Sequence, residues 1–287
     1  MPESRGPSID ALVPAEIARK AEAVGAQKVR LDFWSLLVLA ILAGAFIAFG
    51  AMFATTVLAG TSGVMPFGVA RMLAGFVFCL GLVLVVVGGA ELFTGNTLMV
   101  MALASGKVRL GEMLRAWVIV YVGNFIGAVG VAVLVIAAGQ YRFGEGSVAK
   151  VALDIAVSKV NLPFSESLAL GILCNVLVCL AVWLSLGAHS TTDKVMAIIF
   201  PISAFVAAGF EHSVANMYLV PLGLLIKETA PAPVWTQVGE IARLDTLSWG
   251  AFAWSLVPVT IGNIIGGSVL VGGVYWFVYL RNAPRAQ

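Results

Sequence analysis

The chain has 287 residues, of which 60% are apolar and only 11% are charged, and its formal net charge is +2. Soluble globular proteins carry about 25% charged residues, so this composition predicts a polytopic membrane protein. The basic residues form no stripe with interleaved aromatic residues, which argues against nucleic-acid binding. The three cysteines lie inside apolar segments and indicate neither a disulfide framework nor a metal site.

The first 32 residues are polar and charged, and they contain no apolar stretch of the kind that forms a signal peptide. Pro14 begins a short predicted helix in which Ile17, Ala21 and Val24 fall on one face. We expect residues 1–32 to form a cytoplasmic segment that lies at the membrane surface or against a pore mouth. A solvated leader helix is the alternative. Residues 282–287 are expected to be a short cytoplasmic tail.

Six membrane-spanning helices are predicted from apolar runs between charged or Pro/Gly-rich joints. They cover residues 34–58, 67–104, 110–138, 164–188, 195–226 and 247–280. The second and fifth runs are too long for one simple crossing, which takes about 20 residues. Each also contains a polar interruption, at residues 91–96 and 210–216. We therefore predict an all-α membrane protein in which the second and fifth helices are broken.

The two halves of the chain share motifs. One interruption contains Glu91 and the other Glu211, and in each case an asparagine, Asn96 or Asn216, follows five residues later. The third and sixth spans each contain glycine, asparagine, two apolar residues and glycine, at residues 123–127 and 262–266.

Residues 33–139 and 164–281 are therefore predicted to be two copies of a three-span repeat within a membrane domain of residues 33–281. An odd number of crossings places the second copy upside down. Inverted repeats with paired broken helices indicate a transport site near the middle of the bilayer. Lys and Arg are about twice as numerous in the flanking segments on the side of the termini, so both termini are predicted to be cytoplasmic.

His212 lies in the second interruption, beside Glu211, in an otherwise apolar region. Ionisable groups at this depth are expensive and usually face a cavity or an ion path. The ordinary histidine pKa of about 6.5 lets the ring change charge near neutral pH, so it can donate a hydrogen bond or a proton to an anion. A buried histidine with a purely structural role is the alternative.

Polar residues around both breaks receive provisional roles. Thr94 can hydrogen-bond a substrate or cap the half-helix that follows it. The N-termini of two half-helices carry partial positive charge, which favours a small anion between them. We expect Glu91 and Glu211 to point back into the protein and to hold the broken loops by accepting backbone N–H bonds. Asn96 and Asn216 are also assigned to loop support.

Lys159 lies in the joint between the two halves. Its positive charge could raise the local anion concentration at a pore mouth, and an ordinary solvated lysine is the alternative.

Three segments, residues 91–96, 209–217 and 258–267, resemble the formate/nitrite transporter family, and the likeness covers about residues 32–281. The resemblance implies an aquaporin-like protomer of six spans and a homopentamer with one pore per subunit in a bacterial-type inner membrane.

The resemblance also implies roles for individual residues. His212 and Thr94 would face the substrate, Asn175 would be a polar partner of the central site, and Lys159 would lie in the outer vestibule. Apolar constrictions are expected at the matching positions, which are Phe78, Leu82, Leu92 and Phe205.

Within the family, residues 210–212 and 258–267 are most similar to the formate channels, although Asn161 and Leu162 stand where formate channels have histidines. Formate is the expected substrate, and nitrite or hydrosulfide on the same scaffold are the alternatives. In the expected mechanism His212 protonates the anion or shares a proton with it, because a neutral acid crosses an apolar constriction more easily than a bare anion. The N-terminal segment could close the cytoplasmic mouth.

Three other classes of protein fit less well. An enzyme would need a nucleophile and base, a metal cluster or a cofactor motif, and none of these is present in the sequence. Water and glycerol channels use paired Asn-Pro-Ala loops, and the chain contains no Asn-Pro dipeptide. A scaffolding protein would not explain polar breaks at matching places in both halves. We therefore predict a transport protein that uses no cofactor.

Overall fold

The structure is a computed structural model that describes residues 10–282. The predicted tail at residues 282–287 lies outside the described residues except for residue 282. All regular secondary structure in residues 10–282 is helical. The first half contains α1 (Pro14–Val29), α2 (Phe33–Leu58), α3 (Phe67–Gly88), α4 (Phe93–Asn96), η1 (Thr97–Met99), α5 (Val100–Ala104), α6 (Leu110–Ala137) and η2 (Gln140–Arg142). The second half contains α7 (Ser147–Val160), α8 (Phe164–Gly187), α9 (Thr191–Ala208), α10 (Ser213–Thr229), α11 (Ala232–Val238), η3 (Leu244–Thr246), α12 (Trp249–Ile264), η4 (Ile265–Gly273) and α13 (Val274–Tyr279).

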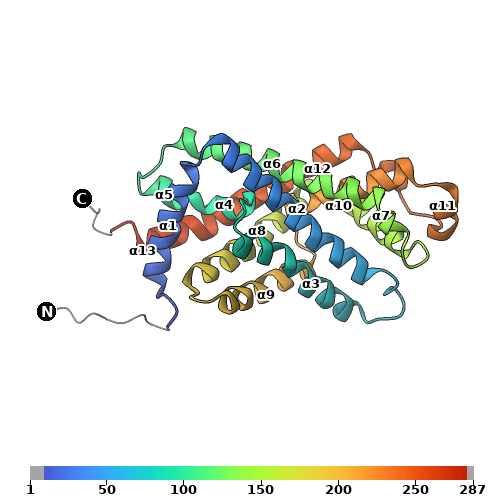
Figure 1. Cartoon of the computed structure of the whole chain (residues 1–287), viewed down its shortest axis with the longest axis horizontal. Helices are drawn as coiled ribbons and strands as arrows, with labels where there is room; N and C mark the ends of the chain where they lie inside the picture. Colours follow the sequence, from blue (N-terminus) through green and yellow to red (C-terminus); the bar gives the residue numbers. More distant parts are fainter. Residues whose placement is uncertain (1–9, 283–287) are drawn as a thin grey trace.

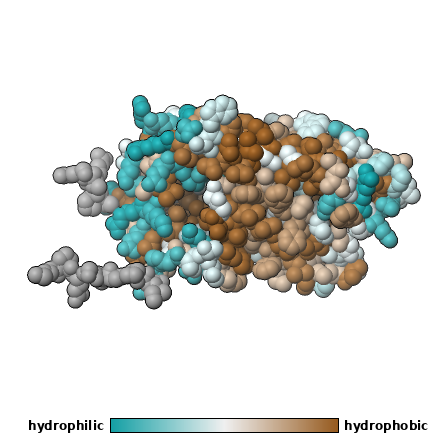
Figure 2. Space-filling model, viewed as in Figure 1, coloured by the Kyte–Doolittle hydropathy of each residue, from teal (hydrophilic) through white to brown (hydrophobic). Residues whose placement is uncertain are grey.

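Six helical segments within residues 10–282 are long and apolar enough to cross a membrane: α2, α3, α6, α8, α9 and the continuous segment from α12 to α13. On the face shown in Figure 2, hydrophobic residues form a band across the middle of the molecule, and hydrophilic residues gather toward its two ends. α1 and α13 lie at one end, and α7 and α11 lie at the other (Figure 1). The predicted fold class, an all-α polytopic membrane protein with six spans, is confirmed.

Both predicted breaks are present, but each begins earlier than the sequence suggested. α3 ends at Gly88 and is followed by Gly89, whose φ of 80° is left-handed, and the chain resumes as a helix at Phe93. α9 is followed in the same way by Gly209, with φ 78°, and α10 begins at Ser213. Glycine adopts this backbone conformation without steric cost, so it ends a helix effectively. Thr94 therefore lies inside a helical turn, although its polarity had placed it within the interruption.

The packing repeats between the halves. α2 packs against α3 and α6, and α8 packs in the same way against α9 and α12. The close approaches depend on glycine at equivalent places. A Cβ at Gly127 would overlap the Ile41 carbonyl oxygen of α2, and a Cβ at Gly266 would overlap the Ile172 carbonyl oxygen of α8. Such small residues let helix backbones approach in a membrane, and here they bring α6 and α12 up to the breaks.

The N-terminal helix α1 packs into the protein. It contacts η1, α5 and α8, and its Ile17, Ala18 and Ala21 are buried. This packing agrees with a helix held against the interior and not with a solvated leader. α1 also precedes α2 as α7 precedes α8: Lys28 and Val29 end one helix, and Lys159 and Val160 end the other. The structural repeat therefore begins with α1.

Candidate functional site

Two asparagines hold the broken loops. Asn124 of α6 accepts a bond from the Phe93 N–H at 2.9 Å and donates to the carbonyls of Ala40 and Glu91 at 2.7 and 2.9 Å. Asn263 of α12 accepts from the Ser213 N–H and donates to the carbonyls of Gly171 and Glu211, each at 2.9 Å. Both asparagines are fully buried. Because broken helices expose backbone groups that must be paired inside the membrane, these side chains stabilise the breaks.

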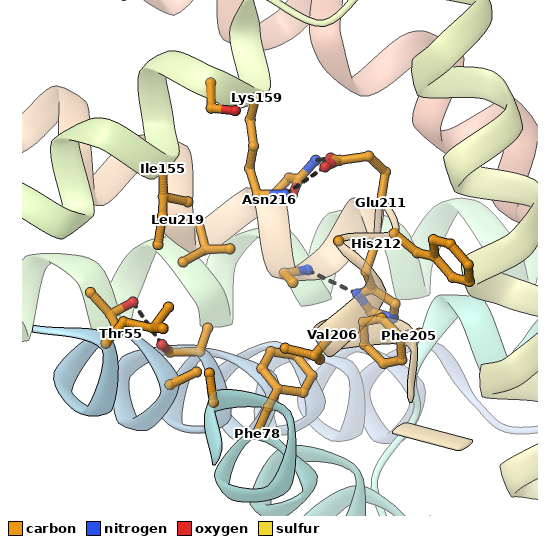
Figure 3. Close-up of a pocket in the computed structure, with 18 of the residues that line it drawn as sticks. Thr55, Phe78, Ile155, Lys159, Phe205, Val206, Glu211, His212, Asn216 and Leu219 are labelled. Carbon is orange, nitrogen blue, oxygen red and sulfur yellow. Dashed lines mark hydrogen bonds and ion pairs between the residues drawn. The ribbon is translucent and has the colours of Figure 1, made fainter. Parts of the chain in front are cut away.

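The carboxylates of the breaks bind side chains, which corrects the expectation of backbone N–H bonds. Glu91 accepts from the Asn96 amide at 2.8 Å and lies 3.1 Å from the Lys28 ammonium of α1. Glu211 accepts from the Asn216 amide at 2.7 Å and from Lys159 of α7 at 2.8 Å. In the second half the two donors bind different oxygens of Glu211, whereas in the first half both donors lie at the same oxygen of Glu91. Figure 3 shows the second group, with Lys159, Glu211 and Asn216 side by side.

His212 and Thr94 are brought together from opposite halves of the chain. The Nε2 atom of His212 lies 3.0 Å from the Thr94 hydroxyl, and both residues are buried. The Ala215 N–H donates to His212 Nδ1 at 3.0 Å, so this side chain caps α10. A backbone N–H can only donate, and a neutral imidazole has one N–H. Nδ1 is therefore unprotonated, and Nε2–H points at Thr94.

The Asn175 amide lies beside the same site. Its Nδ2 group donates to the Asn263 carbonyl at 2.6 Å, and it is also within 3.2 Å of the Thr94 carbonyl and 3.1 Å of the Thr97 hydroxyl. The residue is fully buried. Asn175 therefore ties the turn that carries Thr94 to α12.

Two cavities lie on either side of the His212–Thr94 contact. The first, which we call the Lys159 cavity, has a volume of about 360 Å³ and is lined by Lys159, Glu211 and His212 among others. The second, the Lys28 cavity, has a volume of about 290 Å³ and is lined by Lys28, Glu91 and Gly95 among others. The Lys159 cavity thus reaches His212 itself, and the Lys28 cavity reaches Gly95, the residue that follows Thr94.

Apolar side chains line each cavity on the side of the central pair. Phe78 and Phe205 line the Lys159 cavity, and their rings meet edge to face with centroids 5.5 Å apart. The Phe205 ring also stacks on the His212 imidazole at 5.9 Å, as Figure 3 shows. Leu82 and Leu92 line the Lys28 cavity. All four of these apolar side chains are buried.

Four residues of this site received no role from the sequence: Lys28, Arg71, Asn124 and Asn263. The two asparagines lie in the motif that revealed the repeat, and applying the repeat to Lys159 would have identified Lys28. Arg71 gave no such signal, because a basic residue near a span end is common. Among residues 10–282, no cluster of three His, Cys, Asp or Glu side chains could hold a metal ion.

Known proteins resemble this chain over nearly its full length. The family model for formate/nitrite transporters matches residues 15–277. The formate channel FocA of Escherichia coli K12 is 43% identical over 95% of this chain and 96% of its own length. FocA of Haemophilus influenzae is 37% identical over 91% and 93%.

Solved structures agree with these sequence relatives. A pentameric formate channel with formate bound matches with a TM-score of 0.82 and 42% identity, over 87% of this chain and 98% of the other. An ion channel of the same family matches with a TM-score of 0.77 and 29% identity, over 92% and 98%. The chain therefore belongs to the formate/nitrite transporter family.

Proposed function

We propose that the protein is a formate channel, assembled as a homopentamer with one pore in each subunit. The observation that carries the proposal is the buried His212–Thr94 pair, which lies between two lysine-lined cavities. The relatives named as formate channels and the formate-bound pentamer support the choice of substrate and assembly. We place the protein in a bacterial-type inner membrane with both termini in the cytoplasm, from the distribution of basic residues.

In this proposal the anion enters one cavity, crosses a pair of apolar side chains and reaches the central pair. A bare carboxylate loses much of its hydration there, which is expensive unless hydrogen bonds replace the lost water. His212 Nε2–H is the donor that the anion meets when it displaces the Thr94 hydroxyl. The anion then passes the apolar pair on the other side of the centre and leaves through the other cavity.

Proton transfer from His212 would carry a structural consequence. An imidazolium has protons on both ring nitrogens, so the Ala215 N–H would lose its acceptor at Nδ1. Protonation of His212 would therefore release the cap of α10 as well as supply a proton. We propose that His212 acts as a neutral hydrogen-bond donor near neutral pH, and that acid pH adds a proton-coupled mode.

His212→Asn tests this role. Asparagine is a good N-cap residue, so the variant keeps the α10 cap while it removes the imidazole ring that the proposed proton-coupled mode requires. We expect the ratio of formate flux at acid pH to flux at neutral pH to fall close to one. Flux into proteoliposomes with labelled formate measures the ratio. A wild-type ratio in the variant would contradict the proton-coupled mode.

Phe205→Ala tests the aromatic constriction. Removal of the ring widens the inner end of the Lys159 cavity, where Phe205 stacks on His212, so acetate and lactate should gain flux relative to formate. We also expect a stability loss of about 3–5 kcal/mol, which is usual when a buried phenylalanine is truncated. Competition between labelled formate and the larger acids measures selectivity, with Phe200→Ala, at an exposed position of the same helix, as the matched control. Unchanged selectivity would exclude Phe205 as a filter.

The substrate itself is tested by uptake of labelled formate into proteoliposomes, with nitrite, hydrosulfide and acetate as competitors. Formate flux that acetate competes poorly would support the proposal. Flux of nitrite or hydrosulfide without formate flux would overturn the choice of substrate and retain the family.

A further inference from the structure

Arg71 joins two helices at the edge of the Lys159 cavity. It lies near the beginning of α3, and its guanidinium donates from Nε to the Ala207 carbonyl at 3.2 Å and from a terminal nitrogen to the Val206 carbonyl. Both carbonyls belong to the last turn of α9. Arg71 also lines the Lys159 cavity. A guanidinium has five N–H donors, so these two bonds leave donors for a ligand.

Two of the charged residues that line this cavity form an ion pair with each other, and a third has an ion-pair partner outside it. Lys159 is 2.8 Å from Glu211, which neutralises it. Asp154, which also lines the cavity, lies 3.7 Å from Lys150. Within residues 10–282 the hydrogen bonds of the Arg71 side chain go to uncharged carbonyl oxygens, and Glu211 acts on Arg71 electrostatically without forming an ion pair with it. Arg71 is therefore the cation of this cavity that has no ion-pair partner among the described residues, whereas the sequence had pointed to Lys159, which is paired with Glu211.

The same two bonds lie beside the aromatic constriction. Phe78 is two helical turns after Arg71 on α3, and Phe205 directly precedes the bonded Val206 on α9. The Phe78 and Phe205 rings are in contact across these helices. A planar guanidinium that binds two neighbouring carbonyls fixes position and orientation better than a single ammonium can. Arg71 thus ties together the ends of the two helices that carry the rings, in addition to the close approach of Gly75 to Ser203.

We infer that Arg71 is a further anion-binding and specificity-determining residue of this pathway. Its charge concentrates small monovalent anions such as carboxylates in the Lys159 cavity, and its two bonds to α9 keep the Phe78–Phe205 opening narrow. The inference rests on the proposed function and deepens it, because it assigns capture and selection on this side to a residue with no earlier role.

Two substitutions separate the two roles. Arg71→Gln removes the charge and the paired bonds, whereas Arg71→Lys keeps the charge and loses the paired geometry. At low ionic strength and low formate, we expect Arg71→Gln to reduce the initial formate flux about tenfold, since charge-lined clefts raise local ion concentrations by at least that factor. The deficit should shrink in high salt, which screens the charge. Arg71→Lys should retain most of the flux.

Selectivity should respond differently. Both variants are expected to raise the ratio of acetate flux to formate flux severalfold, because both free the last turn of α9. Full-length protein in proteoliposomes serves for both readouts. Arg243→Gln, an exposed basic residue in the loop before η3, is the matched control and should leave both readouts at wild-type values. Arg71→Met replaces Arg71→Gln if that variant does not assemble.

Each role can be overturned separately. Wild-type formate flux in Arg71→Gln, or an equal loss in Arg71→Lys, would overturn the role of the charge. A wild-type acetate ratio in both variants would overturn the role in selectivity. Wild-type protein without formate flux would overturn the proposed function and this inference with it, whereas a functional wild type with unchanged Arg71 variants would overturn this inference alone.

Discussion

Asn263→Leu is expected to prevent stable assembly of the protein. Leucine has a similar size, but it would leave the carbonyls of Gly171 and Glu211 and the N–H of Ser213 without their bonds to this side chain. Each unpaired buried group costs about 1–3 kcal/mol, so the three together cost about 3–9 kcal/mol. Proteins are commonly stable by only about 5–15 kcal/mol. Thermal unfolding in detergent and the oligomeric state on a sizing column measure the effect.

Asn124→Leu provides the matched test in the other half, because Asn124 makes the same three kinds of bond at the first break. The two variants should be destabilised to a similar degree. Asn161→Leu is the control: this half-buried asparagine bonds the Val157 carbonyl and the Thr246 hydroxyl, away from both breaks. If Asn263→Leu unfolds at the wild-type temperature, Asn263 does not hold the break.

Removal of one partner from the Lys159–Glu211 pair is expected to be the second large effect. The side chains are only 14% and 5% exposed, so Lys159→Met leaves a buried and uncompensated carboxylate. Such losses cost about 3–5 kcal/mol. The double variant Lys159→Met with Glu211→Gln should be more stable than Lys159→Met alone, because no buried charge remains. Unfolding of the two single variants and the double variant measures the coupling.

The exposed pair Lys150–Asp154, whose side chains are 47% and 51% exposed, is the control for this cycle. Exposed pairs contribute about 0–1 kcal/mol, so Lys150→Met should change little. Removal of Lys28 from the equivalent Lys28–Glu91 pair should cost an amount of stability between the losses at Lys159 and at Lys150, since the Lys28 side chain is 30% exposed. Strictly additive effects at Lys159 and Glu211 would mean that the pair does not contribute to stability.

The spans and breaks could be predicted from the sequence because hydrophobic length and glycine are local signals. The predicted positions of the breaks were wrong by a few residues, because the polar side chains of Thr94 and Asn96 indicated that both residues belong to the first interruption. A buried side chain such as Thr94 can lie in a helical turn when its polar atoms find partners, and Thr94 finds His212. The end of a helix is set by backbone conformation at glycine, which polarity does not report.

The partners of the site residues could not be predicted, because they come from elements far apart in the chain. Lys28 reaches Glu91 only because α1 packs into the protein. The amides of Asn124 and Asn263 reach the breaks only because glycines let α6 and α12 approach their neighbours. The central residues His212 and Thr94 could be predicted individually, whereas the cap that fixes the His212 tautomer depends on where α10 begins.

Because the two halves are inverted, the residue types along the pathway occur in almost the same order from either membrane face. On the proposed pathway a solute would meet lysine, glutamate and asparagine, then an apolar pair, then the Thr94–His212 contact, and afterwards the same kinds of residue in the opposite order. Such a palindrome presents the same series of groups from both membrane faces, and net flux of an anion through a passive channel follows the electrochemical gradient of that anion. Any rectification must come from what breaks the palindrome, which is the aromatic pair with Arg71 on one face and the leucine pair on the other.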